Sequence, residues 1–200
     1  MFAQIVQGRV TDPAGLRKQW ERWVEDVRPN AQGFLGATAG VTAGGEFVSI
    51  ARFEDEAAAR ANSDRPEQSA WWEETSQYVA DAMFHDCTQV DVFGGGGSDD
   101  AGFVQVIQGK VTDVEKSRAL DAKMEPAMRE ARPDVIGGVN AWHPDNGRFT
   151  TFIYFTSEAE ARAKEKEMED TEAFAEIMQE MQALSDGEPK YMDLTEPWTT

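Results

Sequence analysis

The sequence contains few cysteine and histidine residues, which many catalytic and metal-binding sites use. Its 200 residues include one cysteine, Cys87, and two histidines, His85 and His143. A single cysteine excludes an internal disulfide, so we expect a reducing, cytoplasmic location and an inert thiol. The two histidines form no ligand pair and no HExxH motif, so we expect no metal site.

Long apolar runs and basic clusters are also missing. No run of about 18 apolar residues predicts a membrane span, and no basic-then-apolar leader predicts a signal peptide. The net charge is −18, with 17 acidic and 8 basic residues in 1–100 and 20 and 11 in 101–200, so each half carries −9. Such a chain should be repelled by nucleic-acid phosphates and by anionic lipids. Glycines 94–97 do not lead from a strand into a helix, which argues against a phosphate-binding loop.

What the sequence does contain is a duplication. Residues 2–12 read FAQIVQGRVTD and residues 103–113 read FVQVIQGKVTD, with seven of eleven positions identical. One structural unit is therefore used twice. We expect a first unit over 1–93, a Gly-rich, flexible linker over 94–101 and a second unit over 102–200.

Each repeat predicts the order strand, helix, two strands, helices, strand, which is the β-α-β-β-α-β arrangement of ferredoxin-like domains. In the first repeat the expected elements are a strand at 2–10, a helix from Pro13 to Arg28, strands at 33–42 and 47–53, a short helix to about 61, a helix at 67–84 and a strand at 87–93. Both faces of the strands are apolar. The fold class is therefore α+β, with two tandem units expected to form a pseudo-twofold barrel within one chain, as a monomer or weak homodimer.

Several segments resemble a known family. They are FAQIVQGRVTD, FVSIARFEDEAAARA over 47–61 and the aromatic helix start Ser69–Trp72, with FVQVIQGKVTD and FTTFIYFTSEAEARA over 149–163 in the second repeat. The chain is similar to antibiotic biosynthesis monooxygenase-like domains of the dimeric α+β barrel superfamily. That superfamily holds cofactor-independent monooxygenases, haem-degrading enzymes, decarboxylases and members of no known activity, so the fold alone does not select a function.

The resemblance implies oxidation of a small aromatic or polyketide-like molecule, with no cofactor. Candidate residues are sought where the repeats differ, above all at Asn140-Ala-Trp-His143, which we align with Thr38-Ala-Gly-Val41. The predicted catalytic residues are Asn140, His143, Tyr154 and Arg52, and the predicted substrate-binding residues are Trp72 and Trp142.

Structural explanations of these residues stay open. Arg52 either reaches water from a sheet edge or lines a cavity, and His143 can simply flank a turn. Four tryptophans either form an aromatic pocket or fill the core: Trp20, Trp23, Trp71 and Trp72. The alternative functions are a non-catalytic small-molecule-binding or stress-related protein and a haem-binding variant using His85, which is expected at the exposed end of the 67–84 helix.

Overall fold

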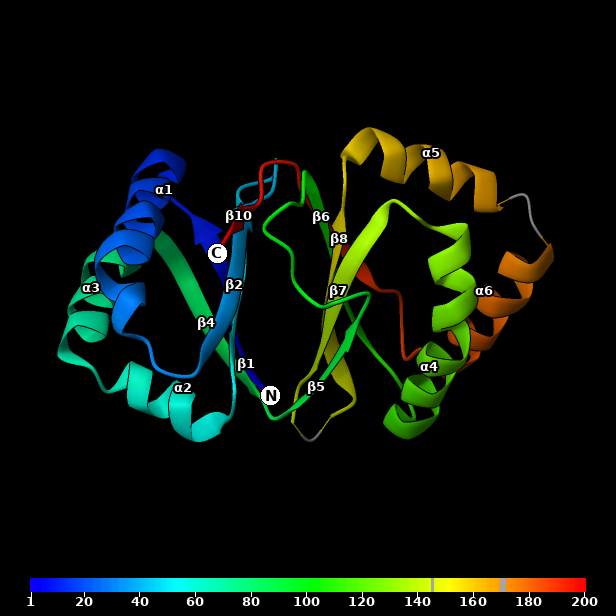
Figure 1. Cartoon of the computed structure of the whole chain (residues 1–200), viewed down its shortest axis with the longest axis horizontal. Helices are drawn as coiled ribbons and strands as arrows, with labels where there is room; N and C mark the ends of the chain where they lie inside the picture. Colours follow the sequence, from blue (N-terminus) through cyan, green and yellow to red (C-terminus); the bar gives the residue numbers. More distant parts are fainter. Residues whose placement is uncertain (145, 170–171) are drawn as a thin grey trace. The chain divides into compact units, whose positions relative to one another are not determined.

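The computed structural model describes residues 1–144, 146–169 and 172–200. The chain forms two compact units, one made of Met1–Val90 with Glu196–Thr200 and the other of Asp91–Thr195. Each unit is a five-stranded sheet with its α-helices on one face, as Figure 1 shows for each unit. The two tandem ferredoxin-like units predicted from the repeat are therefore confirmed.

The sheet of the first unit has the strand order β10-β2-β3-β1-β4. Its strands are β1 (Phe2–Val10), β2 (Phe34–Val41), β3 (Glu46–Phe53), β4 (Val79–Cys87) and β10 (Trp198–Thr199). Its helices are α1 (Pro13–Arg22), a π-helical turn (Trp23–Val27), a 3₁₀ turn (Arg28–Asn30), α2 (Glu56–Ser63) and α3 (Pro66–Ser76).

The sheet of the second unit has the order β5-β7-β8-β6-β9. Its strands are β5 (Gln89–Phe93), β6 (Phe103–Lys110), β7 (Val135–Trp142), β8 (Arg148–Phe155) and β9 (Lys190–Leu194). Its helices are α4 (Val114–Ala131), α5 (Glu158–Glu169) and α6 (Glu172–Leu184). β5 begins at the end of the first unit and joins the sheet of the second.

The repeated Thr-Asp pair starts a helix in both units. The carboxylate of Asp12 accepts a hydrogen bond from the backbone N–H of Gly15 at 3.0 Å, and Asp113 accepts one from Lys116 at 3.0 Å. These side chains satisfy amides that have no partner within the helix. Asp55 caps α2 in the same way, through Ala58 at 2.8 Å.

The two repeats exchange their last strands. β5 ends the first repeat but pairs in the second sheet, whereas β10 ends the second repeat and pairs with β2. The two compact units therefore do not end where the sequence repeats 1–93 and 102–200 end. The last residues of each repeat belong to the other unit. The Gly-rich stretch after β5 lies against β7, because a Cβ on Gly137 would come within 2.0 Å of the Gly96 carbonyl oxygen.

The helix predicted over 67–84 is wrong in its second half. α3 ends at Ser76, and β4 begins at Val79 and pairs antiparallel with the free edge of β1. The apolar spacing through Val79 and Met83 fits a helix, but pairing with β1 overrides this local signal. The strand predicted at 87–93 is likewise split, because β4 ends at Cys87 and β5 begins at Gln89.

The strand ladders also correct the alignment of the two repeats. Ala39 pairs with Ser49 in the first sheet, and Asn140 pairs with Thr151 in the second. Asn140 therefore corresponds to Ala39 and Trp142 to Val41, one residue away from the predicted alignment with Thr38 and Gly40. The extra residue of the second repeat lies in the hairpin turn, where it shifts the numbering and leaves the strand pairing intact.

We call the face of each sheet that packs on helices its helix-side face. In the first unit this face carries two apolar clusters. One contains Leu16, Ala39, Phe47, Val79 and Trp198, and the other contains Phe2, Phe53 and Ala59. Because side chains alternate along a strand, Ser49 and Ala51 of β3 lie on the same face, between the clusters.

Candidate functional site

A pocket of about 370 Å³ lies between the sheet and the helices of the first unit. Its aromatic lining consists of Trp20, Trp23, Phe47, Phe53, Trp71, Trp72, Phe84 and Trp198. Polar side chains also line it, from Gln4, Ser49, Asn62, Ser63, Gln68, Ser69, Glu73 and Thr75. The volume and the mixture of aromatic walls with a few polar groups are those of a small-molecule site.

Small side chains on the sheet leave this space open. The floor includes Ala37 of β2 with Ser49 and Ala51 of β3. The position equivalent to Ala51 in the second sheet is Ile153, which packs against Phe103, Phe155 and Ala161. Beside it, the ring of Phe93 lies over Gly138, where a Cβ would approach it to 1.8 Å. The second unit thus fills the corresponding region of its sheet.

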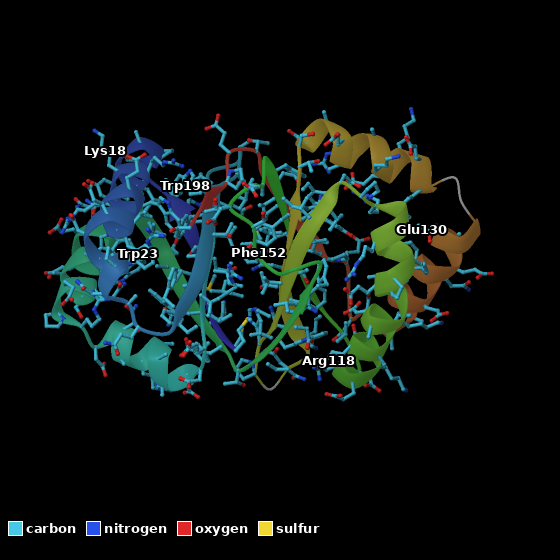
Figure 2. All side chains as sticks on the ribbon, viewed as in Figure 1. Lys18, Trp23, Arg118, Glu130, Phe152 and Trp198 are labelled. Atoms are coloured by element: carbon cyan, nitrogen blue, oxygen red, sulfur yellow. The ribbon has the colours of Figure 1, made fainter. Side chains whose placement is uncertain are left out.

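The tryptophan walls are fixed by hydrogen bonds and ring contacts. The indole N–H of Trp23 donates to Oε1 of Gln68 at 2.8 Å, and that of Trp71 donates to the carbonyl oxygen of Gln19 at 2.8 Å. Trp72 meets Phe84 edge-on, with ring centroids 5.0 Å apart. Figure 2 labels Trp23 in the helix layer and Trp198 on the strand at the edge of the sheet.

Two amide side chains are oriented toward the pocket by their partners. Arg65 donates to Oδ1 of Asn62 at 2.8 Å, and Trp23 donates to Oε1 of Gln68. Since guanidinium and indole groups only donate, each contact fixes which atom of the amide is oxygen. Among the described residues, neither amide NH₂ group makes a hydrogen bond. Asn62 is only 7% exposed, so its NH₂ group is available mainly to a molecule in the pocket.

The helix layer over the pocket is tied together and locally irregular. Arg22 of α1 forms an ion pair with Glu74 of α3. After α1 the chain makes a π-helical turn from Trp23 to Val27, whereas α4 of the second unit is continuous over 18 residues. Such π turns are rare and often occur at functional sites. Here the turn begins at a tryptophan that lines the pocket.

Of the six residues predicted from sequence, the structure places Trp72 in this pocket. Arg52 belongs to the same unit, but it alternates with Ala51 and Phe53 and so lies on the opposite face of β3. Its Nε atom is buried and has no hydrogen-bond partner within the described structure.

The other four predicted residues lie in the second unit, on two different faces of its sheet. Asn140 accepts a hydrogen bond from Thr151 Oγ1 at 3.0 Å, and the Trp142 ring lies 5.6 Å from that of Phe149, both on the helix-side face. On the other face of the sheet, Nε2 of His143 lies 2.9 Å from Oγ1 of Thr150. Tyr154 shares that second face, because it alternates with Ile153 and is fully buried. The structure therefore does not gather these four into one cluster.

A polar cluster surrounds Trp142. Its indole N–H donates to Asp91 at 2.9 Å, and Arg118 of α4 donates to both oxygens of the same carboxylate at 2.7 and 2.6 Å. The guanidinium holds the pKa of Asp91 below its usual range. Asp121, three residues along α4 from Arg118, has its pKa raised to about 6 by loss of hydration and by the Asp91 charge.

His85 does not lie at a helix end, as predicted, but within β4. It pairs with Ile5, while Phe84 and Asp86 beside it pair with Val6 and Gln4 on the pocket side. His85 therefore faces away from the pocket and cannot ligate an iron centre there. The described residues contain no group of three potential metal ligands. No helix in the described part of the chain is long and apolar enough to cross a membrane.

Three residues of the pocket lining were not predicted from the sequence, namely Asn62, Gln68 and Trp198. Asn62 occurs in an Ala-rich helix, and nothing local marks it as buried. Gln68 is one of several polar residues at the start of α3. Trp198 reaches the pocket only because β10 pairs with β2, far away in the sequence.

No protein-family model and no curated protein sequence matches the chain. Among solved structures, a candidate monooxygenase from Lactobacillus acidophilus has a TM-score of 0.76 at 15% identity, covering 96% of this chain and 92% of its own. An anthrone oxidase-like protein has a TM-score of 0.67 at 11% identity, covering 99% and 92%. A regulator of staphylococcal pathogenesis has a TM-score of 0.54 at 8% identity, covering 97% and 98%.

All three structures cover both units, so the whole two-unit chain has counterparts of known structure. At these identities the likeness concerns the fold alone. It confirms the predicted fold of two tandem ferredoxin-like α+β units, which the candidate monooxygenase and the anthrone oxidase-like protein share.

Proposed function

We propose that the first unit binds a planar aromatic ketone or phenol in its pocket and promotes oxidation of that molecule by dioxygen. The observation that carries the proposal is the combination of a tryptophan-lined pocket of about 370 Å³ with the oriented amides of Asn62 and Gln68. The proposal agrees with the fold, which an anthrone oxidase-like protein shares.

The pocket suits a flat, mostly apolar molecule. Indole rings offer large contact areas and stack well on other aromatic rings. Trp71 and Trp72 lie with centroids 6.0 Å apart, and Trp20, Trp23 and Trp71 form a connected series of rings across the helix layer. A ligand stacked on this series would also be removed from water.

The two amides supply what the chemistry needs. Oxidation of an anthrone-like ketone begins when a C–H proton leaves and negative charge develops on the carbonyl oxygen. The NH₂ groups of Asn62 and Gln68 can donate to that oxygen and stabilise the enolate. Glu73, an exposed carboxylate in the pocket lining, is the residue that we assign to accept the proton.

The enolate then supplies the electrons that reduce dioxygen. The reacting CH₂ group loses two hydrogens and gains one oxygen atom as a carbonyl, and the second oxygen atom leaves as water. The protein's contribution is to bind and orient the substrate, hold the enolate and keep bulk water out.

The predicted roles of Asn140, His143, Tyr154 and Arg52 stay predictions. Asn140 and Trp142 lie on the helix-side face of the second unit, and we propose that any ligand there is separate from the one in the first-unit pocket. Asn140→Ala beside Asn62→Ala tests this assignment. We expect the first-unit substitution to lower anthrone oxidation and the second-unit substitution to leave it in place.

The test uses anthrone as the probe. Binding is followed by quenching of tryptophan fluorescence, and oxidation by dioxygen uptake and anthraquinone formation above the rate in buffer. Ala51→Ile places in the pocket floor the residue that the second unit carries, so we expect at least tenfold weaker binding. Ile153→Ala, the reciprocal change in the second unit, is the matched control.

The outcomes separate the candidate functions. Binding with dioxygen uptake that Ala51→Ile suppresses supports the proposal. Binding without dioxygen uptake favours a non-catalytic small-molecule-binding protein. If anthrone and its hydroxylated derivatives do not bind, both versions of the proposal fail.

A further inference from the structure

We infer that Trp198, carried into the first unit by the exchanged strand β10, determines how long an aromatic molecule the pocket accepts. This inference rests on the function proposed above and extends it to the size of the substrate. Trp198 comes from the last residues of the second repeat, yet it lines the pocket of the first unit and is only 8% exposed.

The pocket runs along β3 between two apolar ends. Phe47 and Trp198 belong to the cluster at one end, and Phe53 belongs to the cluster at the other. Six residue steps separate Phe47 from Phe53, a distance of about 20 Å along an extended strand. Asn62 lies on α2, whose Ala59 packs in the Phe53 cluster. Trp198 and Asn62 therefore lie toward opposite ends.

This arrangement gives the bound molecule a direction. An oxygen held by the Asn62 amide would lie toward the Phe53 end, and the aromatic body would extend along β3 toward Trp198. The position of the Trp198 ring then limits the number of fused rings that can fit. The substrate class is a linear polycycle with its reactive oxygen toward the Asn62 end.

Trp198 is held as a fixed wall. Its ring centroid lies 6.1 Å from that of Trp20 and 6.5 Å from that of Phe47, and the guanidinium carbon of Arg17 lies 5.2 Å above the ring. The backbone of its strand is held as well, since Ala37 and Thr200 exchange N–H···O bonds of 2.7 and 3.0 Å. Arg28 adds a hydrogen bond to the Thr200 hydroxyl.

The fold itself does not require a tryptophan here. The exchanged strand of the second unit, β5, instead brings Asp91, which binds Arg118 and Trp142, and Phe93, which covers Gly138. Trp198 is thus a feature of the unit that has the tryptophan-lined pocket. We therefore assign Trp198 a role in selecting the ligand, and not a role in holding the exchanged strand that both units would need.

The experiment compares dissociation constants for a three-ring and a four-ring linear ketone, anthrone and 5(12H)-tetracenone, by fluorescence quenching. Wild-type protein should favour anthrone. Trp198→Ala should shift the ratio of the two dissociation constants at least tenfold toward tetracenone, and Trp198→Phe, which keeps an aromatic wall with one ring fewer, should give a smaller shift in the same direction. Tyr191→Ala, at an exposed aromatic of β9, is the control.

Circular dichroism and thermal melting of each variant show whether β10 remains docked, and Trp198→Phe provides the answer if Trp198→Ala unfolds. A wild-type protein that binds anthrone while both Trp198 variants keep the wild-type ratio overturns the role of Trp198 and leaves the proposed function standing. A wild-type protein that binds neither ketone overturns the proposed function, and the inference with it. A shift in the Tyr191 control equal to that in the Trp198 variants also contradicts the inference.

Discussion

Arg65 links Asn62 to the end of the π-helical turn. It donates from Nη1 to Oδ1 of Asn62 at 2.8 Å and from Nη2 to the carbonyl oxygen of Val27 at 2.9 Å. The same guanidinium is paired with Glu67 at 2.8 Å. One side chain thereby fixes both the helix layer and the amide that faces the pocket, so Arg65 acts as a positioning residue for Asn62.

Asn62→Ala should reduce the rate of anthrone oxidation by about 100-fold, the usual effect of losing one donor to a developing oxyanion. Its dissociation constant for anthrone should change much less, because the aromatic walls remain. Arg65→Lys keeps the charge but loses the two-pronged geometry. It should also lower the turnover rate more than the affinity. Equal losses in affinity and rate would indicate that the amide acts only in ground-state binding.

The matched control for this pair is Asn146→Ala, which removes an amide that bonds the backbone of Arg148 in a second-unit turn. It should leave turnover unchanged. Melting temperatures of Asn62→Ala and Arg65→Lys identify any loss of rate that comes from unfolding.

The sequence predicts those parts of the fold that local signals encode. The first strand, the capped helix after Asp12 and the hairpin between β2 and β3 lie where the apolar pattern, the Asp-Pro pair and the Gly-Gly turn place them. Each signal acts within a few residues. The repeat then carries the same interpretation over to the second unit.

The features that were missed depend on contacts between distant residues. Val79 and Met83 fit the helical period of the preceding residues, and only pairing with the free edge of β1 makes their segment a strand. The pocket exists because Ala51 is small where Ile153 is not, a difference with no meaning until the two strands are aligned by their ladders. Trp198 completes the pocket by strand exchange, which no local pattern indicates.

The Asp91–Arg118 pair should anchor β5 to the second unit. The two-oxygen contact of 2.7 and 2.6 Å joins the exchanged strand to α4, and both side chains are about two-thirds covered. We expect a double-mutant cycle of Asp91→Asn and Arg118→Gln to give a coupling free energy of roughly 0.5–1 kcal/mol, measured by urea unfolding at pH 7.

The pH dependence of this pair has a defined sign. The pKa of Asp91 is lower in the folded protein, so the folded state binds a proton less readily than the unfolded chain. The ion pair therefore stabilises the folded protein fully above the unfolded pKa of aspartate, about 3.9. This stabilisation is lost as the pH falls through the pKa that Asp91 has in the folded protein. A coupling free energy that stays the same as the pH is lowered from 7 to the onset of acid unfolding would contradict this origin.

Asp121 should show the opposite behaviour. Its pKa is raised to about 6, so the ionised carboxylate destabilises the folded protein at pH 7, and this penalty disappears as the pH falls through 6 toward 4. Asp121→Asn should therefore raise the melting temperature at pH 8 more than at pH 5. Glu188→Gln, which removes the same charge at an exposed position, should not show this difference. Carboxyl NMR titration of Asp121 measures the pKa directly.

Asp81 marks a bulge that shapes the edge of the first sheet. It has a φ of 54° and lies where the pairing of β4 with β1 shifts, between Gln7 and Arg9. Gly8 faces this bulge, and a Cβ there would lie 2.8 Å from the carbonyl oxygen of Ala80. The left-handed backbone at Asp81 tolerates aspartate, and the close approach of the two strands at Gly8 requires glycine.

Asp81→Val should lower the free energy of unfolding by about 1–2 kcal/mol, because a β-branched residue is strained at this positive φ. Asp81→Gly relieves the strain but adds freedom to the unfolded chain, so its effect should be within about 1 kcal/mol of zero. Ala80→Val, the same side chain one residue earlier in an extended backbone, is the control and should be tolerated. Equal destabilisation by valine at 80 and 81, measured by urea unfolding, would show that the loss comes from side-chain size and not from the left-handed backbone of the bulge.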